Sequence, residues 1–491
     1  MDLLVWILFA YLAWCLIQAL HFITKKKAKP GTFNDNLPPG PPPLPLIGNL
    51  LVLGNLPPRT TPARVHDHYR HFLARARPRD PPNSRHSILQ SPYPRQCHSL
   101  PSRQARVAVD ACLAALEETP ENMQPANICQ QEARLDSTQC LRREAVQELV
   151  AHVEKCARTG DAVDISEAAF RTSLNFLSNT IFSSDLTDPS LVSIKELKEI
   201  VGNILCEAGK PNVANYFPVL KKIDPQVSRH RMKVYFEQMF DLFNRAIQKR
   251  MQLRAMPSSL RMNDVLDTLV DIKEDNNENM DILLMKHLFL DLFVAGTDTT
   301  SSTLEWAMVE LLHSPAKLLQ AQAELDRVIG RGNPIEESEV ARLPYFQAII
   351  KGTFRLHPPA PLLLPRRSEA ESRIQGFTIP KGAQIFVNVW AMRRDPALWE
   401  DPNVFSPERF LGSEMDVKGQ SFELIPFGRG RRICPGLPLA LRMLDMMLGT
   451  LLNCFDWKLE DGIEPEDMNM DDRFGLTIQK DQPLRDVPTL V

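Results

Sequence analysis

The stretch Pro426-Phe427-Gly428-Arg429-Gly430-Arg431-Arg432-Ile433-Cys434-Pro435-Gly436 places one cysteine in a loop rich in glycine and arginine. A largely apolar, helical stretch follows from Leu437 to Leu452. Glycine lets backbone amides approach the sulfur, Arg432 adds positive charge, and the helix after Gly436 presents its positive end. These features stabilise a thiolate, which binds iron strongly and pushes electron density toward an oxygen ligand. The loop therefore predicts that Cys434 is a metal ligand.

Two alternatives explain the same loop without iron. The loop would also suit a glycine turn around a buried structural cysteine, or a phosphate-binding loop, although the Lys-Ser ending of a phosphate loop is absent. The chain has nine cysteines and no Cys-x-x-Cys pair. In a cytosolic protein we expect such thiols to be reduced and mostly packed as small apolar side chains.

The loop matches the haem-thiolate signature Phe-x-x-Gly-x-Arg-x-Cys-x-Gly at every fixed position, with Phe427, Gly430, Arg432, Cys434 and Gly436. On these residues the chain resembles the cytochrome P450 family of haem-thiolate monooxygenases. The resemblance implies that the five residues bind haem (iron protoporphyrin IX) and that Cys434 is the axial ligand of its iron. It also implies that Arg432 contacts a haem propionate, with Arg366 as a second candidate.

A second motif, Ala295-Gly296-Thr297-Asp298-Thr299-Thr300, lies in a predicted helix from Leu283 to Leu312. A glycine inside a helix costs about 1 kcal/mol relative to alanine. Threonine hydroxyls can bond back to the i−4 carbonyl and bend the helix. The motif resembles the family's oxygen-activation site, which implies that Asp298 and Thr299 relay protons to dioxygen. Taken alone, both residues could equally be polar groups on a helix face.

Three later segments resemble the same family in the same order, namely residues 355–359, 395–402 and 405–410. The first ends a predicted helix at Pro358-Pro359. In the family, the arginine at the position of Arg409 pairs with the arginine at the position of Arg355 and with a glutamate. The resemblance extends over about residues 134–484, with residues 38–49 as a second patch. The amino-acid sequence of these segments is most similar to that of plant enzymes of the geraniol-hydroxylase type. This similarity suggests small apolar, terpenoid substrates.

One departure from the family falls within this pattern. Where the family has Glu-x-x-Arg, this chain has Gly352 three residues before Arg355. Arg355 and Arg409 would then share no carboxylate. Loss of one member of a buried charge network costs about 3–5 kcal/mol, and glycine in the helix adds about 1 kcal/mol.

A second departure covers residues 59–132. The chain has no lysine at positions 30–154 and no glycine at positions 55–159, while five of its eleven histidines fall within residues 66–98. No strand or helix is predicted within residues 60–100, so composition favours disorder. Translation in a wrong frame is the alternative: with permitted codons, residues 116–124 shifted by one base read Trp-Lys-Lys-Leu-Arg-Lys-Ile-Cys. That peptide contains Trp-x-x-x-Arg, which resembles the family's propionate-binding motif and is missing from the chain as given.

The N-terminus predicts a membrane anchor. Residues 3–24 are apolar apart from Gln18 and His21, and as a helix they would reach about 33 Å, enough to cross a bilayer core. A cleaved signal peptide is the alternative, but the positive charges at Lys25, Lys26 and Lys27 follow the apolar run instead of preceding it. The positive-inside rule places the rest of the chain in the cytosol. A basic and proline-rich hinge follows over residues 25–49.

The sequence thus predicts a mainly α chain with three parts: a transmembrane signal-anchor at residues 1–24, the hinge at residues 25–49, and one cytochrome P450-like domain with a small β component at residues 50–491. A net charge of −3 gives no bias toward nucleic acid. The resemblance implies a single-pass protein of the endoplasmic reticulum membrane. It would insert one atom of O2 into a small apolar substrate, with electrons from an NADPH-dependent flavoprotein reductase. The alternatives are a catalytically silent or haem-free relative, and a thiolate isomerase or peroxygenase that needs no reductase.

Overall fold

The computed structural model describes residues 88–91 as backbone and residues 136–491 with short gaps at 187–192, 211, 217–219, 221, 257–260, 263, 275–280, 375–376 and 474. The predicted anchor, the hinge and nearly all of the atypical segment lie outside the described residues. The chain divides into two compact units: Met1–Arg85, Gln90–Pro92 and Arg367–Ile385 form one, and His86–Leu89, Tyr93–Arg366 and Phe386–Val491 form the other. All predicted site residues belong to the second, larger unit.

Strands β4 (Ser372–Ile374) and β5 (Phe377–Ile379) are short strands that lie wholly within the first unit. Strand β4 pairs antiparallel with β5, with Arg373 opposite Thr378. A separate three-stranded sheet has the order β1-β6-β3, formed by Ile88–Ser91, Gln384–Val387 and Arg366–Arg367. The expectation of no strand within residues 60–100 was wrong for these four residues. A four-residue strand is too short to show alternation in sequence, and pairing with distant residues decides it.

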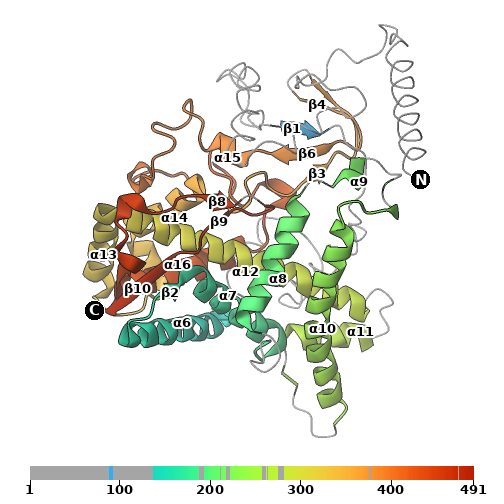
Figure 1. Cartoon of the computed structure of the whole chain (residues 1–491), viewed down its shortest axis with the longest axis horizontal. Helices are drawn as coiled ribbons and strands as arrows, with labels where there is room; N and C mark the ends of the chain where they lie inside the picture. The colour runs from blue at the N-terminus through green and yellow to red at the C-terminus, as the bar shows by residue number, and fades with distance from the viewer. Residues whose placement is uncertain are drawn as a thin grey trace, which may run out of the picture. The chain divides into compact units, whose positions relative to one another are not determined.

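The second unit is helical (Figure 1). Its described α-helices are α6 Gln139–Thr159, α7 Ile165–Phe182, α8 Ile194–Gly209, α9 Val213–Tyr216, α10 Ser228–Arg254, α11 Val265–Glu274, α12 Ile282–His313, α13 Pro315–Ile329, α14 Pro344–Leu356, α15 Val389–Met392 and α16 Leu437–Cys454. The prediction of a mainly α fold with a small β component is confirmed for this part of the chain.

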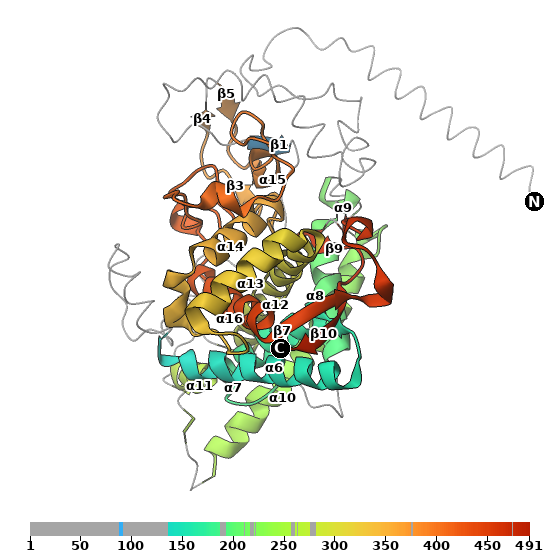
Figure 2. The same ribbon diagram turned by 90° about the vertical axis from the view of Figure 1, so that its left-hand side faces the viewer.

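Helix α12 is the central element of the larger unit. It begins after Asp281, whose carboxylate accepts a hydrogen bond from the Leu284 amide at 2.6 Å, and it runs without a break to His313. Residues 300–312 are buried on all sides of the helix. Helices α7, α10 and α16 pack against it (Figures 1 and 2). The helix predicted over Leu283–Leu312 is therefore confirmed, and its all-round apolar character follows from burial on every face.

Helix α16 leads from the cysteine loop into a small antiparallel sheet. Its last residue is followed directly by β7 (Phe455–Leu459), and β10 (Arg485–Leu490) lies between β7 and β2 (Val163–Asp164). Lys458 is opposite Val487, and Val163 is opposite Asp486. A second hairpin pairs β8 (Asp472–Arg473) with β9 (Gln479–Lys480). The helix predicted over Leu437–Leu452 is confirmed and is two residues longer at its C-terminal end.

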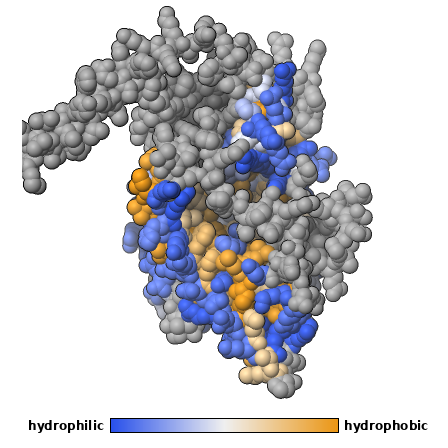
Figure 3. Space-filling model, turned by 90° about the vertical axis from the view of Figure 1, so that its right-hand side faces the viewer, coloured by the Kyte–Doolittle hydropathy of each residue, from blue (hydrophilic) through white to orange (hydrophobic). Residues whose placement is uncertain are grey.

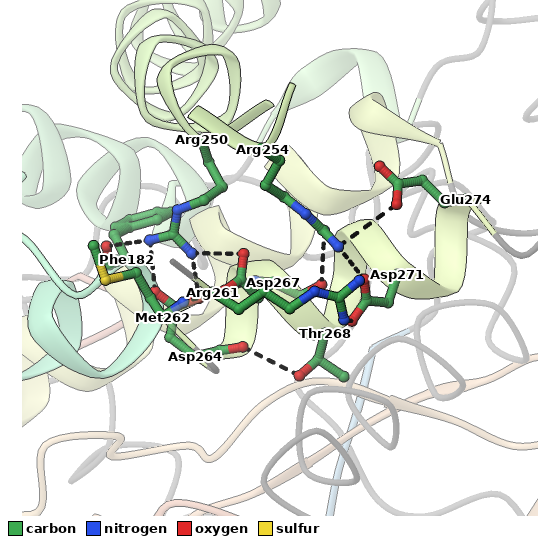
Figure 4. A network of polar contacts seen from close by, with 10 residues as sticks. All are labelled: Phe182, Arg250, Arg254, Arg261, Met262, Asp264, Asp267, Thr268, Asp271 and Glu274. Atoms are coloured by element: carbon green, nitrogen blue, oxygen red, sulfur yellow. Dashed lines mark hydrogen bonds and ion pairs between the residues drawn. The ribbon is translucent and has the colours of Figure 1, made fainter. Parts of the chain in front are cut away.

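A buried polar network joins the ends of α7, α10 and α11 (Figure 4). The Arg250 guanidinium donates to both oxygens of Asp264 at 2.7 Å and to the carbonyl of Phe182 at 2.8 Å, and it pairs with Asp267 at 3.0 Å. Arg254 on the next turn pairs with Asp271. Because both nitrogens of the Arg250 fork find carboxylate partners, this buried charge is compensated.

The surface on one side of the molecule mixes hydrophilic side chains with scattered apolar ones (Figure 3). Within the described residues, α16 is the one helix long and apolar enough to cross a membrane, and about two thirds of it is buried in the protein. That burial identifies α16 as a core helix. The five described cysteines are free thiols, of which only Cys454 is fully buried, so the expectation that most thiols are buried is not met there.

Candidate haem-thiolate site

The cysteine loop is a tight turn that depends on two glycines. Gly428 and Gly430 have φ of 73° and 72°, a left-handed conformation that side-chain-bearing residues rarely adopt. The Cys434 amide donates to the Phe427 carbonyl at 2.9 Å, and the Ile433 amide donates to the Gly430 carbonyl at 2.9 Å. The turn thus returns the chain to the start of α16 with the cysteine at its tip.

Cys434 lies at the N-terminus of helix α16. The residue is exposed, and the backbone amides of Gly436 and Leu437, where α16 begins, favour the thiolate form of the sulfur. Desolvation by the surrounding loop raises the pKa of the thiol above its ordinary value, while the two amides act in the opposite direction. A bound metal ion would deprotonate such a thiol outright. The alternative of a buried structural cysteine is therefore wrong for Cys434.

The other signature residues lie in the same loop, and Gly436 is the one placed next to the sulfur. A Cβ at Gly436 would lie 3.8 Å from the sulfur. The Phe427 ring packs edge-on against Phe354 of α14, with 5.0 Å between centroids. Arg432 is exposed, and one Arg366 nitrogen would lie 3.5 Å from a Cβ at Gly428. The structure therefore brings the Arg366 guanidinium to the loop that carries Cys434.

The oxygen motif lies midway along α12, where one face of the helix opens. Ala295 is exposed and Thr299 is half-buried, although the following turns are buried. The Thr299 hydroxyl donates back to the Ala295 carbonyl at 2.7 Å. A Cβ at Gly296 would lie 3.0 Å from the Leu177 side chain on α7, so a larger residue there would require Leu177 to shift. The expected threonine-to-carbonyl hydrogen bonds are confirmed.

The structure directs Asp298 away from Thr299. Its carboxylate accepts a hydrogen bond from the Thr477 hydroxyl at 2.8 Å and another from the side-chain amide of Gln479. Burial raises the pKa of Asp298, and these two hydrogen bonds lower it in part. Sequence analysis did not identify these two partners, because a contact across about 180 residues leaves no local pattern.

The arginines near Gly352 have backbone partners in place of a carboxylate. Arg355 is fully buried and donates to the carbonyls of Arg393, Pro402 and Val404 at 3.0, 2.6 and 2.7 Å. Arg409 donates to the Val404 carbonyl as well, at 3.4 Å. Among the described residues, no salt bridge to Arg355 or Arg409 is formed. A Cβ at Gly352 would lie 3.0 Å from the Phe405 ring.

Uncompensated charge is visible in the same cluster. Burial, followed by repulsion from Arg409, lowers the pKa of Arg355 to about 9. Burial, followed by repulsion from Arg394, lowers the pKa of Arg393 to about 9. Several guanidinium nitrogens of Arg355, Arg393 and Arg394 are buried without a hydrogen-bond partner. These contacts agree with the expectation that Arg355 and Arg409 share no carboxylate. Backbone carbonyls accept part of the hydrogen bonds that such a carboxylate would accept.

The residues of the cysteine loop fit a haem. Cys434 is exposed, the Gly436 and Leu437 amides favour its thiolate form, and Gly436 leaves close-approach space beside the sulfur. Arg432 and Arg366 are cations that suit carboxylate groups at the edge of such a ligand. This set holds one sulfur ligand and cationic partners, which distinguishes it from a closed tetrahedral metal site.

Comparison with known proteins agrees with this site. The family profile described as Cytochrome P450 matches residues 114–485. The geraniol 8-hydroxylase of Swertia mussotii is 47% identical over 96% of both chains. The geraniol 8-hydroxylase of Catharanthus roseus is 45% identical over the full length of both. The drimenol monooxygenase of Persicaria hydropiper is 46% identical over 93% of this chain and 92% of the relative.

Solved structures share the fold. A zebra fish cytochrome P450 crystallised with abiraterone is 26% identical, with a TM-score of 0.57 over 72% of this chain and 78% of the other. A second zebra fish structure, with progesterone, is 23% identical, with a TM-score of 0.60 over 79% and 82%. Fold and site define the class as a haem-thiolate oxidoreductase. The chain belongs to the cytochrome P450 family, whose members carry haem with a cysteine ligand on the iron.

Proposed function

We propose that Cys434 is the axial iron ligand of a monooxygenase that hydroxylates a small apolar, terpenoid substrate. The observation that carries this proposal is the position of Cys434, an exposed residue at the start of α16 whose thiolate form the Gly436 and Leu437 amides favour. Phe427 and Gly430 shape the loop, and Arg432, with Arg366, would hold the haem propionates. Haem supplies the redox chemistry that activates dioxygen when it is bound.

The protein groups on α12 would deliver protons in this reaction. Insertion of one oxygen atom consumes two electrons and two protons for each O2, with water as the second product. The Thr299 hydroxyl lies on the open face of α12 and would have to turn from the Ala295 carbonyl to donate a proton there. Asp298, the adjacent residue, would hold the proton, and its carboxyl group would have to leave Thr477 and Gln479 to pass it to Thr299. Both act as positioned acids.

The proposal also covers the substrate class, the electron donor and the location of the protein in the cell. Two of the relatives named above are geraniol 8-hydroxylases, which supports a monoterpene alcohol as the substrate class. Electrons come from an NADPH-dependent flavoprotein reductase in the same membrane. The apolar residues 3–24, followed by lysines, support a single-pass anchor in the endoplasmic reticulum with the catalytic domain in the cytosol.

Reconstitution tests the activity. The full chain, the reductase, NADPH, oxygen and geraniol are combined, and hydroxylated product is measured by mass spectrometry. We expect product that depends on reductase and is lost in Cys434→Ala. Absence of product from a haem-loaded chain with geraniol and related terpenoids would contradict the proposal.

Thr299→Ala separates proton delivery from oxygen reduction. Without the hydroxyl, we expect NADPH to be consumed but product per NADPH to fall about tenfold or more, with hydrogen peroxide released instead. Thr299→Ser is the matched control and retains coupling. Equal coupling in the alanine variant would exclude Thr299 from the relay.

A catalytically silent relative is the second candidate, and the Gly352 site favours it. Arg355, Arg393 and Arg394 have buried guanidinium nitrogens without a hydrogen-bond partner, and this chain has Gly352 where the family has a glutamate. A chain that folds with haem but gives no turnover with reductase, or that does not retain haem, would support this second candidate.

A further inference from the structure

A continuous chain of hydrogen bonds links Asp298 to the protein surface. Gln479 donates through its amide nitrogen to one Asp298 oxygen, and its amide oxygen accepts from the Arg473 guanidinium at 2.6 Å. Thr477 donates to the other Asp298 oxygen at 2.8 Å. Asp298 and Thr477 are buried, Gln479 is half-buried and Arg473 is exposed. Two residues, Gln479 and Arg473, thus connect the carboxylate at the centre of α12 to solvent.

A small cavity lies beside this chain. It is lined by Gly202, Leu205 and Cys206 of α8 and by Arg473, Gly475, Thr477 and Gln479 of the opposite segment. Its size suits one water molecule, and three of its lining side chains, Arg473, Thr477 and Gln479, offer polar partners that can hold one. Thr477 and Gln479 are the two side chains that line the cavity and also hydrogen-bond to Asp298.

Glycines bring α8 and the 475–479 segment close enough to form the cavity. A Cβ at Gly209 would lie 2.4 Å from the Leu476 amide nitrogen, so no other residue fits there without a backbone shift. The Leu476 amide donates to the Leu205 carbonyl at 3.3 Å. On the other side, the Ser302 hydroxyl of α12 donates to the Ile478 carbonyl at 2.7 Å. Contacts from two helices therefore hold the lining rigidly.

Positive charge surrounds the carboxylate on this side. Lys198 of α8 and Arg473 of β8 are the two charged groups whose fields favour the ionised form of Asp298. Lys198 also lies 3.7 Å from Asp164. Burial raises the pKa of the Asp298 carboxyl, while the two hydrogen bonds and these cations act against that rise. The groups on this side therefore favour the ionised form of Asp298, which can accept a proton.

We propose that Asp298 takes up its protons from solvent through Thr477 and the water-sized cavity between α8 and β9. A water in the cavity donates a proton to the Thr477 hydroxyl oxygen while the proton already on Thr477 passes to the Asp298 carboxylate. Bulk water at the Arg473 side restores the cavity water. No electrons move, and one carboxylate becomes one carboxylic acid. This inference rests on the proposed function, because the monooxygenase reaction consumes the protons.

The competing explanation is that Thr477 and Gln479 only fix the β8–β9 hairpin to α12. The amount of product formed per NADPH distinguishes this structural explanation from the proposed proton route. Reduction of O2 to product plus water and reduction of O2 to hydrogen peroxide both need two protons. A restricted proton supply therefore slows both outcomes together and leaves product per NADPH unchanged. If the substitution instead displaced the β8–β9 hairpin, we would expect the product formed per NADPH to change.

The test compares Thr477→Val, which keeps the shape and removes the hydroxyl, with Thr477→Ser, which keeps the hydroxyl. With reductase and NADPH, we expect the valine variant to be about 10- to 100-fold slower, with unchanged coupling and a larger solvent isotope effect in D2O. The serine variant should resemble the parent chain. Driven by added hydrogen peroxide, which brings its own protons and electrons, both variants should form product at the parent rate.

A high-resolution crystal structure of the holoenzyme supplies a measurement independent of turnover. We expect an ordered water in the cavity, within hydrogen-bond distance of the Thr477 hydroxyl. An empty cavity at that position would overturn the proposal, because the route needs a water beside Thr477.

The outcomes also separate this inference from the proposed function. If the parent chain turns over and Thr477→Val equals Thr477→Ser in rate and isotope effect, the route alone is wrong. If the parent forms no product with either oxidant, the proposed function is wrong and the route falls with it. If the valine variant loses peroxide-driven turnover as well, Thr477 is structural.

Discussion

Gly352 is a residue whose replacement we expect to change the stability of the fold. Its position on α14 faces Phe405, and the guanidiniums of Arg355 and Arg393 are fully buried nearby. Carbonyl oxygens satisfy part of the arginine fork but carry no net negative charge. A carboxylate at position 352 would therefore add electrostatic stabilisation that the present contacts lack.

The first prediction is that Gly352→Glu raises the free energy of unfolding and the retention of haem. Gly352→Gln is the matched control, since it has the same shape and helix propensity and must displace Phe405 to the same degree. We expect the glutamate variant to exceed the glutamine variant by about 2 kcal/mol. Thermal melts followed by haem absorbance give the comparison. Identical melting of the two variants would show that the arginines need no carboxylate.

Glu305 makes the stability of the fold depend on pH. The side chain is buried on α12 and accepts a hydrogen bond from the Leu484 amide at 2.9 Å. Burial raises its pKa from 4.5 to about 7. The folded chain therefore binds more protons than the unfolded chain between these two values. Stability from this group is fully present below about pH 4.5 and is lost as pH rises to about 7.

The second prediction follows from that sign. Glu305→Gln keeps an oxygen for the Leu484 amide and removes the titration. Relative to the parent chain, it should gain stability on going from pH 5 to pH 8, by about 3 kcal/mol at most. Denaturant unfolding at the two pH values measures this difference. A parallel pH dependence in parent and variant would assign the effect to other buried acids.

At the scale of elements, helices were predicted better than the contacts between them. Both motif-bearing helices, α12 and α16, begin and end within two residues of the expected positions, because long apolar runs give a strong periodic signal. The short strand β1 was not predicted, since tertiary pairing decides such strands. The partners of Asp298 and the backbone acceptors of Arg355 are long-range contacts without a local signature.

The third prediction concerns the junction of α7, α10 and α11. In Arg250→Met, Asp264 and Asp267 lose their shared partner while both carboxylates are buried. We expect a loss of about 3–5 kcal/mol. Lys233→Met, in an exposed pair with Glu237, is the control and should cost less than about 0.5 kcal/mol. Chemical denaturation measures both, and similar small losses would mean that the Arg250 network does not stabilise the junction.

At the scale of the whole molecule, the family and its cofactor could be predicted from the sequence, but the substrate could not. The signature around Cys434 and the order of the later motifs were sufficient for the family. Substrate choice depends on the shape of a pocket, and one predicted propionate contact falls in residues 59–132, outside the described residues. The wrong-frame hypothesis for that segment is a proposal about the gene.

The fourth prediction tests that proposal. Sequencing the transcript across the codons for residues 116–124 should give a one-base-shifted reading that contains Trp-x-x-x-Arg. A chain corrected in this way should retain haem better than the chain as given, because a second propionate contact is restored. Codons that do not encode the motif in any frame would exclude the hypothesis.

The central claim is that Cys434 binds haem iron as a thiolate in this chain. The most direct measurement is the difference spectrum of the reduced, full-length protein under carbon monoxide, with Cys434→Ser as the control. We predict the red-shifted thiolate band in the parent chain and its loss in the serine variant. A band at the shorter-wavelength inactive position, or no band, in a folded parent chain would contradict the claim.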